Sequence, residues 1–532
     1  MVTNIKDVVI VGAGPVGLFC ALLLGQRNIS VTVYERWPTF YPLPRACGVD
    51  HEIVRMLQDA GLADEMEPLL DPVIGPEKTY EFLDKAGETL LRIDWNRPGA
   101  SGWAQMNMFY QPDLEHVLAR RLETMPHVQI IRGCELTGIH QDRDYVSLQL
   151  SKSGETNELI RDRARYVIGA DGARSAVREA LGISQTDLGF AYDWLVVDVV
   201  PHTERTWKPY VVQHCDPSRP TTLVGSGPGR RRWEFMRMPG EEIAALNTPE
   251  KAWDLLARWD ITPDNATLER HAVYTFRGTW ADHWKNGRVL LAGDAAHLMP
   301  PFLGQGLCSG MRDALALAWR LPMVLSGEAS GALLDSYGPE RSEHVQEIIR
   351  QAVEAGRVIC MLDPAEAAER DERMRAGIEL KPPPEPRLGI SRLYDTGDVN
   401  AGYLSVQGRV ARGGLEGLFD DVVGKGWQLL LRSDKPVPAF NKPARDAIGR
   451  LGVVVATFGS AGDTTDLDGT YAAWFDRLKT DAILVRPDFY VFGTSSLANA
   501  NALVVAAWRA LQGGAPHLIQ QTASGENIAE EI

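Results

Sequence analysis

The sequence predicts an α/β protein of more than one domain, and three observations carry that prediction. A glycine-rich turn, Gly12-Ala-Gly-Pro-Val-Gly17, lies between an apolar β-branched run and an apolar helical stretch. Residues 182–277 change to alternating polar and apolar runs with many turns, which is typical of an antiparallel sheet. The run Val289–Ala292 again has the composition of a buried strand and ends at Gly293-Asp294. The 532 residues also exceed what one hydrophobic core usually organises.

The N-terminal segment predicts a compact βαβ unit. Lys6–Val11 is expected to be a buried parallel strand, Val16–Arg27 a helix and Ser30–Tyr34 a second strand. The apolar run Val8–Gly25 has about the length of a membrane-spanning helix. Its glycines and Pro15 break such a helix, so strand, turn and helix are expected instead.

The glycine spacing predicts a dinucleotide site. Gly12 permits the tight turn, Gly14 lets the backbone approach a pyrophosphate, and Gly17 permits close packing of helix on strand. Glu35 ends the second strand, where a carboxylate accepts hydrogen bonds from ribose hydroxyls. A simple packing turn is the alternative for the glycines alone.

Three polar residues further along accompany predicted strands or helices. Arg45 follows the βαβ unit and either meets the pyrophosphate or an incoming nicotinamide nucleotide, or is an ordinary surface arginine. Gln111 precedes the predicted helix Leu114–Thr124, where it contacts a cofactor or caps the helix. Asp171 follows the predicted strand Tyr166–Gly169 and either caps a helix or also contacts a nucleotide.

The region after Gly182 predicts an antiparallel sheet. Strand patterns lie at Leu195–Val200, Val211–His214 and Trp233–Met238. The run Arg230-Arg-Arg232 lies between strand patterns, and we expect it to be a solvated turn rather than a binding patch.

Asp294 lies between a predicted buried strand and a predicted helix that begins near Leu307. A helix start presents unpaired N–H groups and the positive end of a dipole, so it suits an anionic or electron-rich ligand. The carboxylate just before it suits the hydroxyls of a polyol. Long helices are expected over Leu307–Ser326 and Leu333–Met361.

The C-terminal part predicts a separate small α/β domain. Residues 381–387 form a proline-rich, polyproline-like connection. Beyond it, Trp427–Leu431, Val453–Phe458 and Ala482–Val485 are expected strands, and Leu497–Leu511 is an expected closing helix.

Composition limits the partners. The net charge of −15 comes from 55 Lys and Arg against 70 Asp and Glu, which argues against nucleic acid or an anionic membrane. The six cysteines contain no Cys-x-x-Cys pair, which indicates reduced thiols rather than disulfides or a zinc site. We therefore expect a cytoplasmic protein without a metal; self-association into a homo-oligomer is left open.

Together the motifs resemble those of the single-component flavoprotein aromatic hydroxylases. Gly12-Ala-Gly-Pro-Val-Gly17, Ala170-Asp171-Gly172 and Gly293-Asp294 occur in the order typical of that family, over residues 5–370. Residues 44–50, 299–313 and 363–368 are similar to those of the 3-(3-hydroxyphenyl)propionate and phenol hydroxylase group. The tail is similar to the thioredoxin-like third domain of larger members, but without redox cysteines.

The resemblance implies an FAD-binding Rossmann-like domain, an interleaved antiparallel-sheet substrate domain and a C-terminal thioredoxin-like domain. The expected segments are 1–181 for the first part of the FAD-binding domain, with strands that contribute to the substrate sheet, and 286–380 for its second part and the long helices. The substrate sheet is expected over 182–285, a linker over 381–397 and the thioredoxin-like domain over 398–532.

The resemblance also implies bound FAD, with NADH or NADPH and O2 as co-substrates. By motif position, the residues expected at FAD are Gly12, Gly14, Pro15, Gly17, Glu35, Arg36, Arg45, Gln111, Asp171, Asp294, Pro301, Gly304, Gly306 and Leu307. Asp294 is expected at the ribityl chain and residues 304–307 at the isoalloxazine ring. Asp171 is also expected to help dock a transiently bound pyridine nucleotide.

The implied reaction is hydroxylation of a small phenolic aromatic substrate, ortho to an existing hydroxyl, through a flavin C4a-hydroperoxide. The protein positions the ring, excludes water and supplies a base for the phenolic proton. The sequence does not identify that base: relatives carry an acid where this chain has Cys47. The candidate catalytic residues are Cys47, Asp50, His51, Tyr192, Tyr274 and Pro301.

Three other functions are compatible with the same motifs to different degrees. A tailoring hydroxylase of a larger polyketide or antibiotic aromatic differs only in its substrate pocket, which sequence does not describe. A flavin halogenase requires a Trp-x-Trp-x-Ile-Pro stretch, which the sequence lacks. A non-catalytic flavin-bearing interaction protein keeps the fold but oxidises no substrate.

Overall fold

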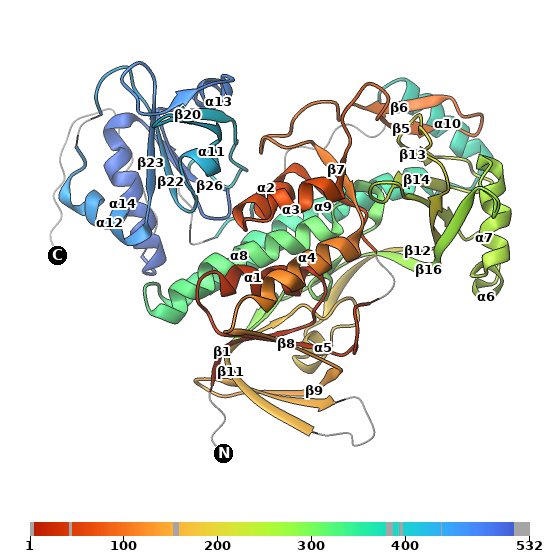
Figure 1. Cartoon of the computed structure of the whole chain (residues 1–532), viewed down its shortest axis with the longest axis horizontal. Coiled ribbons are helices and arrows are strands. Elements are labelled where there is room, and N and C mark those ends of the chain that lie inside the picture. The colour runs from red at the N-terminus through yellow and green to blue at the C-terminus, as the bar shows by residue number, and fades with distance from the viewer. Residues whose placement is uncertain are drawn as a thin grey trace. The chain divides into compact units, whose positions relative to one another are not determined.

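The computed structural model describes residues 5–41, 45–152, 159–378, 387–391, 393, 397–437 and 439–514 (Figure 1). The chain forms two compact units. Unit 1 comprises residues 1–325 and 340–386, and unit 2 comprises residues 326–339 and 387–532. Most of the predicted proline-rich connection, residues 381–386, lies outside the described residues.

The first sheet of unit 1 carries the predicted βαβ unit. Its central order is β17-β18-β11-β1-β2-β8, and the strands from β18 to β8 are all parallel, as expected where helices cover a sheet. β10 pairs antiparallel with β11 and β9. The strands are β1 Lys6–Val11, β2 Val31–Glu35, β8 Val128–Arg132, β9 Cys134–Gln141, β10 Val146–Lys152, β11 Leu159–Gly169, β17 Lys285–Asn286 and β18 Val289–Leu291.

The second sheet of unit 1 has the order β19-β16-β12-β15-β14-β13-β5-β6. It is antiparallel, as predicted, except that β13 pairs in parallel with β5, a strand from far upstream. The strands are β5 Tyr80–Leu83, β6 Thr89–Ile93, β12 Gln185–Pro201, β13 Val211–His214, β14 Thr221–Gly225, β15 Arg231–Met236, β16 Ala266–Ala281 and β19 His297–Leu298. A small third sheet contains β3 Gly48–Asp50, β4 Leu70–Pro72 and β7 Met106–Phe109.

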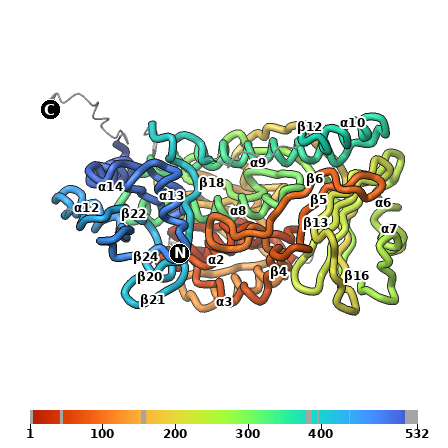
Figure 2. The backbone as a smooth tube through the Cα atoms, turned by 90° about the horizontal axis from the view of Figure 1, so that it is seen from above, coloured from red at the N-terminus to blue at the C-terminus, as the bar shows by residue number. Residues whose placement is uncertain are grey.

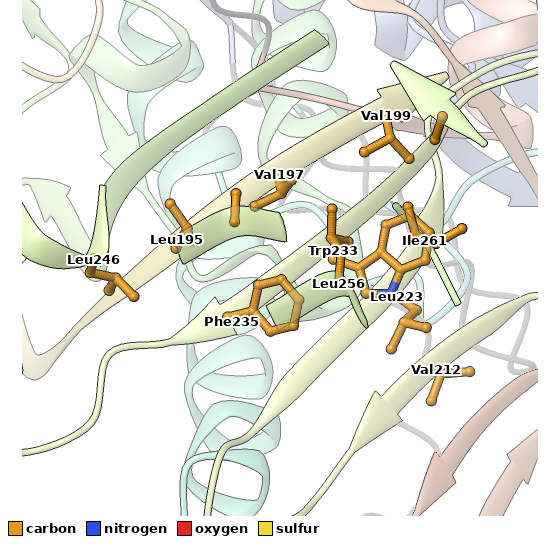
Figure 3. Packing of buried hydrophobic residues seen from close by; sticks show 12 residues of the cluster. Leu195, Val197, Val199, Val212, Leu223, Trp233, Phe235, Leu246, Leu256 and Ile261 are labelled. Atoms are coloured by element: carbon orange, nitrogen blue, oxygen red, sulfur yellow. The ribbon is translucent and has the colours of Figure 1, made fainter. Parts of the chain in front are cut away.

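The core of this second sheet lies on one face (Figure 3). Leu195, Val197 and Val199 of β12 pack with Trp233 and Phe235 of β15, all fully buried or nearly so. Because side chains alternate along a strand, the intervening residues of both strands point to the opposite face. That opposite face borders the cavity described below.

Helices complete unit 1. They are α1 Pro15–Gly25, α2 His51–Asp59, α3 Ala63–Met66, α4 Gln111–Glu123, α5 Ala176–Ala180, α6 Ile243–Leu246, α7 Pro249–Leu256, α8 Gly306–Ser326, α9 Tyr337–Ile359 and α10 Pro364–Arg375. α8 and α9 lie side by side (Figure 1; Figure 2) and are joined by buried ion pairs, including Arg320 with Glu340 at 2.5 Å. The predicted helix Leu333–Met361 is a short 3₁₀ turn followed by α9. No described helix is both long and apolar enough to span a bilayer.

Unit 2 has the predicted thioredoxin-like arrangement. A parallel pair, β22 Gln428–Arg432 and β23 Val454–Phe458, brackets α12 Lys442–Leu451. An antiparallel hairpin, β25 Ala482–Val485 and β26 Val491–Ser495, completes the four-stranded sheet. The remaining elements are β20 Arg409–Arg412, β21 Leu415–Leu418, β24 Thr465–Asp466, α11 Phe419–Val422, α13 Thr470–Leu478 and α14 Ala500–Leu511.

Candidate functional site

A cavity of about 1150 Å³ in unit 1 is the candidate site. The three motif segments predicted from the sequence all line it, together with side chains of the second sheet. Every residue expected to contact FAD borders this cavity except Gly17, which lies behind Gly12. Segments far apart in the sequence therefore meet at one surface.

The glycine-rich turn is tight at two positions and open at the third. A Cβ on Gly12, which has φ +108°, lies 2.3 Å from the Ala170 oxygen, and a Cβ on Gly17 lies 2.0 Å from the Gly12 oxygen. A Cβ on Gly14 meets no protein atom within 4 Å. Gly12 and Gly17 are thus required by the fold itself, whereas Gly14 leaves space that faces the cavity.

Helix α1 begins directly at that open space. Gly14 is its N-cap, no side chain caps it, and Pro15 is its first residue. The uncapped N–H groups and the positive end of the helix dipole therefore favour a phosphate group there.

Glu35 lies beside the same turn. Its carboxylate accepts hydrogen bonds from the N–H of Ala13 at 2.7 Å and of Trp37 at 2.9 Å. Glu35 and the exposed Arg36 both line the cavity. The carboxylate is thereby held at the end of β2, the position expected for a ribose contact.

Arg45, Asp294 and Gln111 form one connected group. The Arg45 Nη1 donates to Asp294 Oδ2 at 2.7 Å, and this carboxylate is the main cause that raises the pKa of Arg45. The Gln111 side-chain oxygen accepts the N–H groups of Arg45 and Ala46 at 3.0 and 2.9 Å. Gln111 also donates to Glu115 at 2.7 Å, so it holds the loop from α4.

Asp171 has the capping role that was one of its two expected roles. It accepts hydrogen bonds from the Ser175 hydroxyl at 2.5 Å and the Val177 N–H at 3.0 Å, at the start of α5. Burial raises the pKa of its carboxyl despite these hydrogen bonds. Asp171 also lines the cavity, so its position is compatible with the other expected role, a contact with a nucleotide.

Buried charges position the turn that carries Asp294. Asp313 on α8 accepts the Gly293 N–H at 3.0 Å and contacts His297 Nε2 at 2.7 Å and Arg341 Nε at 2.9 Å. His297 and Asp313 are almost fully buried, which agrees with a structural role for His297.

The turn between Asp294 and α8 lines the cavity at Pro301, Gly304, Gly306 and Leu307. Gly304 has φ +66°, which a glycine adopts without strain. The Phe302 carbonyl accepts the Tyr80 hydroxyl at 3.0 Å, which ties the turn to strand β5. The turn is thereby joined to the second sheet.

The sheet contributes the inner wall of the cavity. Arg232 and Glu234 on β15 line it, as do Val196 of β12 and Thr222 of β14. These are the residues that alternate with the apolar cluster of Figure 3. Phe276, Phe302, Met106, Met108, Trp95, Tyr80, Val211 and Val224 add an apolar and aromatic surround.

Two arginines and an aspartate form a cluster of buried ion pairs beside this wall. Arg232 pairs with Asp198 through two hydrogen bonds of 2.7 and 3.1 Å, and Arg270 Nη2 lies 2.6 Å from the same carboxylate. The Arg232 Nη1 also donates to the Arg45 carbonyl at 2.6 Å. Burial alone raises the pKa of Asp198, but the two guanidinium groups hold it below its usual value.

The six candidate catalytic residues separate into two groups. Cys47, Tyr274 and Pro301 line the cavity. Burial raises the pKa of Cys47 to about 11 and also raises that of Tyr274, so both are protonated at neutral pH.

Asp50, His51 and Tyr192 are not among the residues that line the cavity. Asp50 caps α2 and pairs with Arg312 at 2.5 Å. Burial opposes ionisation of Asp50, yet Arg312 holds its pKa below the usual value. Asp50 thus has a structural partner within the described fold.

The structure corrects one expectation and adds one residue. We expected Arg230-Arg-Arg232 to be a solvated turn, but Arg231 and Arg232 are buried on β15. The tertiary contact with Asp198 overrides the usual exposure of arginine. Glu234 was not singled out; the alternation of Arg232 and Glu234 with Trp233 and Phe235 is the sequence signal for a polar face.

Two family descriptions match the chain. Residues 6–352 match the family described as FAD binding domain, and residues 402–510 match that described as HcaD C-terminal domain. Together they cover most of both units.

Individual proteins are similar along nearly the whole chain. A probable NADH-specific resorcinol 4-hydroxylase of Rhodococcus jostii is 38% identical and covers 92% of this chain and 91% of that protein. A 3-(3-hydroxy-phenyl)propionate/3-hydroxycinnamic acid hydroxylase of Comamonas testosteroni is 32% identical, with 93% and 95% covered. The crystal structure of aklavinone-11 hydroxylase with FAD and aklavinone is 26% identical with a TM-score of 0.77, covering 96% of this chain and 100% of that one.

Proposed function

The chain belongs to the family of FAD-dependent aromatic hydroxylases, and from that premise we propose that it uses NADH and O2 to hydroxylate a small phenol. The new hydroxyl group enters ortho to an existing one. In balance, the phenol, O2, NADH and one proton give the hydroxylated phenol, NAD⁺ and water. The similarity to an NADH-specific resorcinol hydroxylase supports both NADH and the phenolic substrate.

The residues at the cavity fit FAD. The space in front of Gly14 and the uncapped start of α1 suit a pyrophosphate, and Glu35 suits a ribose. Asp294 suits the hydroxyls of the ribityl chain, with Arg45 and Gln111 beside it. Residues 304–307 offer backbone at the start of α8 for the isoalloxazine ring.

Bound FAD would supply the redox chemistry that links NADH to the activation of O2. The protein holds the phenol and keeps water from the reacting atoms. The buried apolar side chains Val196, Val224 and Phe302 serve the second purpose. The turn at Pro301 is the contact between the flavin part and the substrate part of the cavity.

One observation carries this proposal. One cavity is lined both by the glycine-rich turn at the start of α1 and by apolar and aromatic side chains with a few polar groups among them. Such a combination is typical of a site in which a cofactor meets an aromatic ligand. The turn after Asp294 lines the same cavity and is hydrogen-bonded to strand β5.

A panel of phenols with mass detection tests the proposal. We expect NADH consumption to rise with a suitable phenol and the product to contain one more oxygen atom, which comes from labelled dioxygen. NADPH is expected to be the weaker reductant. NADH oxidation without any oxygenated product, for every phenol, contradicts the proposal and favours a flavin-bearing protein without hydroxylase activity.

A second candidate is hydroxylation of a larger polycyclic aromatic. The likeness to aklavinone-11 hydroxylase, which extends over nearly the whole of both chains, favours it. Polycyclic phenols therefore belong in the same panel. Product from these alone supports the second candidate over the first.

A further inference from the structure

Strand β15 presents two charged side chains to the cavity, one above the other. Arg232 lies in register with Asp198 of β12 and Val224 of β14. Glu234 lies in register with Val196 of β12 and Thr222 of β14, one step further along the strand. Both residues line the cavity and are at most 4% exposed.

The positive charge of Arg232 is compensated by other groups of the protein. Arg232 and Arg270 both contact Asp198, and Arg232 also donates to the Arg45 carbonyl. These are the two buried arginines among the described residues that line the cavity. Both guanidinium groups are thus neutralised by protein groups before a ligand binds, and Asp198 is the carboxylate that they share.

Glu234 differs from the other acids of the cavity. Glu115 is the other buried carboxylate among the described lining residues, and it accepts a hydrogen bond from Gln111. No hydrogen bond joins the Glu234 carboxylate to any described residue. Its nearest cation is Arg232 Nη1, at 3.9 Å. A buried carboxylate without a hydrogen bond is costly in a protein interior, so a donor on the ligand is the natural complement.

The titratable and charged groups facing Glu234 are Arg232 on its own strand, Asp198 of β12, Arg270 of β16 and Cys47. Burial and Asp198 raise the pKa of Glu234, while Arg232 and Arg270 oppose that rise, and the result is about 7. A carboxylate with this pKa is poised for proton exchange at neutral pH. Cys47 and Tyr274, by contrast, are protonated there.

We propose that Glu234 accepts the proton of the substrate's phenolic hydroxyl and that the site selects uncharged phenols over phenols bearing a carboxylate. The inference rests on the proposed function and names its proton acceptor. The phenol O–H bond breaks and a carboxylic O–H bond forms on Glu234. The electron pair remains on the phenolic oxygen and enriches the ring carbon ortho to it, where oxygen enters.

The selection of uncharged phenols follows from charge balance. With Glu234 ionised, the wall carries two carboxylates and two guanidinium groups, joined by contacts of 2.6 to 3.9 Å. A substrate carboxylate at this wall adds an unpaired negative charge in a buried place, which is strongly unfavourable. A hydroxyl group such as the second one of resorcinol adds no charge.

The test uses the holoenzyme as wild type, Glu234→Gln and Glu234→Asp, with resorcinol and 3-(3-hydroxyphenyl)propionate as probes. Oxygenated product and NADH consumption are measured between pH 5.5 and 9. We expect wild-type kcat/KM for resorcinol to rise with pH, with a midpoint near the pKa of about 7. Glu234→Gln is expected to lose that rise and to lower kcat on the order of 100- to 10,000-fold. Glu234→Asp keeps part of the rate and of the pH dependence.

The matched control is Glu269→Gln, the same substitution on β16 at a residue that does not line the cavity. It is expected to leave the pH profile unchanged. All variants are expected to keep their FAD content, which separates loss of proton transfer from loss of cofactor. Glu234→Gln is also expected to bind the carboxylate-bearing phenol at least about tenfold more tightly than wild type above pH 7, measured by the change in flavin absorbance, because the buried repulsion is removed.

Different results overturn different claims. A Glu234→Gln variant with wild-type kcat and pH profile removes Glu234 as the proton acceptor. A wild type that hydroxylates the carboxylate-bearing phenol more efficiently than resorcinol removes the proposed selectivity, even if Glu234→Gln does not fold. Absence of product from wild type with every phenol overturns the proposed function itself.

Discussion

Replacing Gly14 by alanine tests the FAD site without disturbing the fold. The residue has φ −75° and ψ 178°, an extended conformation that alanine adopts without strain. The added Cβ meets no protein atom within 4 Å. It occupies instead the space in front of α1 where we expect a phosphate of FAD. The apoprotein should therefore fold normally while its affinity for FAD falls.

The magnitude follows from the contact that is lost. A methyl group at this position moves the phosphate away from at least one backbone N–H. A hydrogen bond to a charged group contributes about 1.5–3 kcal/mol. Because 1.4 kcal/mol corresponds to a factor of ten, the Kd for FAD should rise roughly 10- to 150-fold.

The assay is titration of apoprotein with FAD, followed by flavin fluorescence, alongside urea unfolding of the apoprotein. Gly449→Ala is the matched control, because its Cβ also meets no atom within 4 Å but Gly449 lies on α12 in unit 2. Its Kd for FAD should equal that of wild type. If Gly14→Ala also binds FAD with wild-type affinity, the placement of the pyrophosphate at this turn is wrong.

Three further substitutions give separate expectations. Asp294→Ala should yield protein with little FAD colour after purification, since it removes the partner of Arg45 and the contact that we propose with the ribityl chain; full flavin content speaks against that contact. Asp313→Asn breaks a buried ion pair with Arg341 and changes the buried contact with His297, and it should lower the free energy of unfolding by about 3–5 kcal/mol, measured by urea unfolding. The pKa of Glu234 is higher in the folded than in the unfolded protein. The contribution of its protonated form to the free energy of unfolding is therefore complete below about pH 4.5 and is lost as the pH rises through about 7. From a usual pKa of 4.5 to about 7, the loss amounts to about 3 kcal/mol at high pH. The difference in stability between wild type and Glu234→Gln should change by that amount between pH 5 and pH 8.5, and an unchanged difference contradicts the pKa.

Much of the FAD end of the site was predictable because its signals are local. The turn at Gly12–Gly17 and the strand-to-helix turn at Asp294 each depend on residues adjacent in the chain. The structure places β1 where predicted and begins α8 within one residue of the expected position. Gln111 and Asp171 were expected either to cap helices or to contact a ligand. The tertiary structure shows in addition that Gln111 accepts the N–H of Arg45 and that Asp171 accepts the Ser175 hydroxyl.

The substrate end was less predictable because its signals depend on strand pairing. Arg232 suggested an exposed turn, since arginine is rarely buried without a partner. Its partner Asp198 lies on β12, and the register of β12 with β15 brings them together. Nothing in the local sequence specifies that register.

By itself, the sequence determined that this chain has a nucleotide-binding βαβ unit, a distant acidic turn and a small C-terminal α/β domain. These features depend on residues that are close together in the chain: glycine spacing, apolar periodicity and the residues at a helix start. They can therefore be recognised in the sequence alone. Only the tertiary structure decided that Glu234 lies buried at the cavity, 3.9 Å from Arg232 and beside the ion pairs of Arg232 and Arg270 with Asp198. The physical reason is that burial and charge balance arise between strands far apart in the chain.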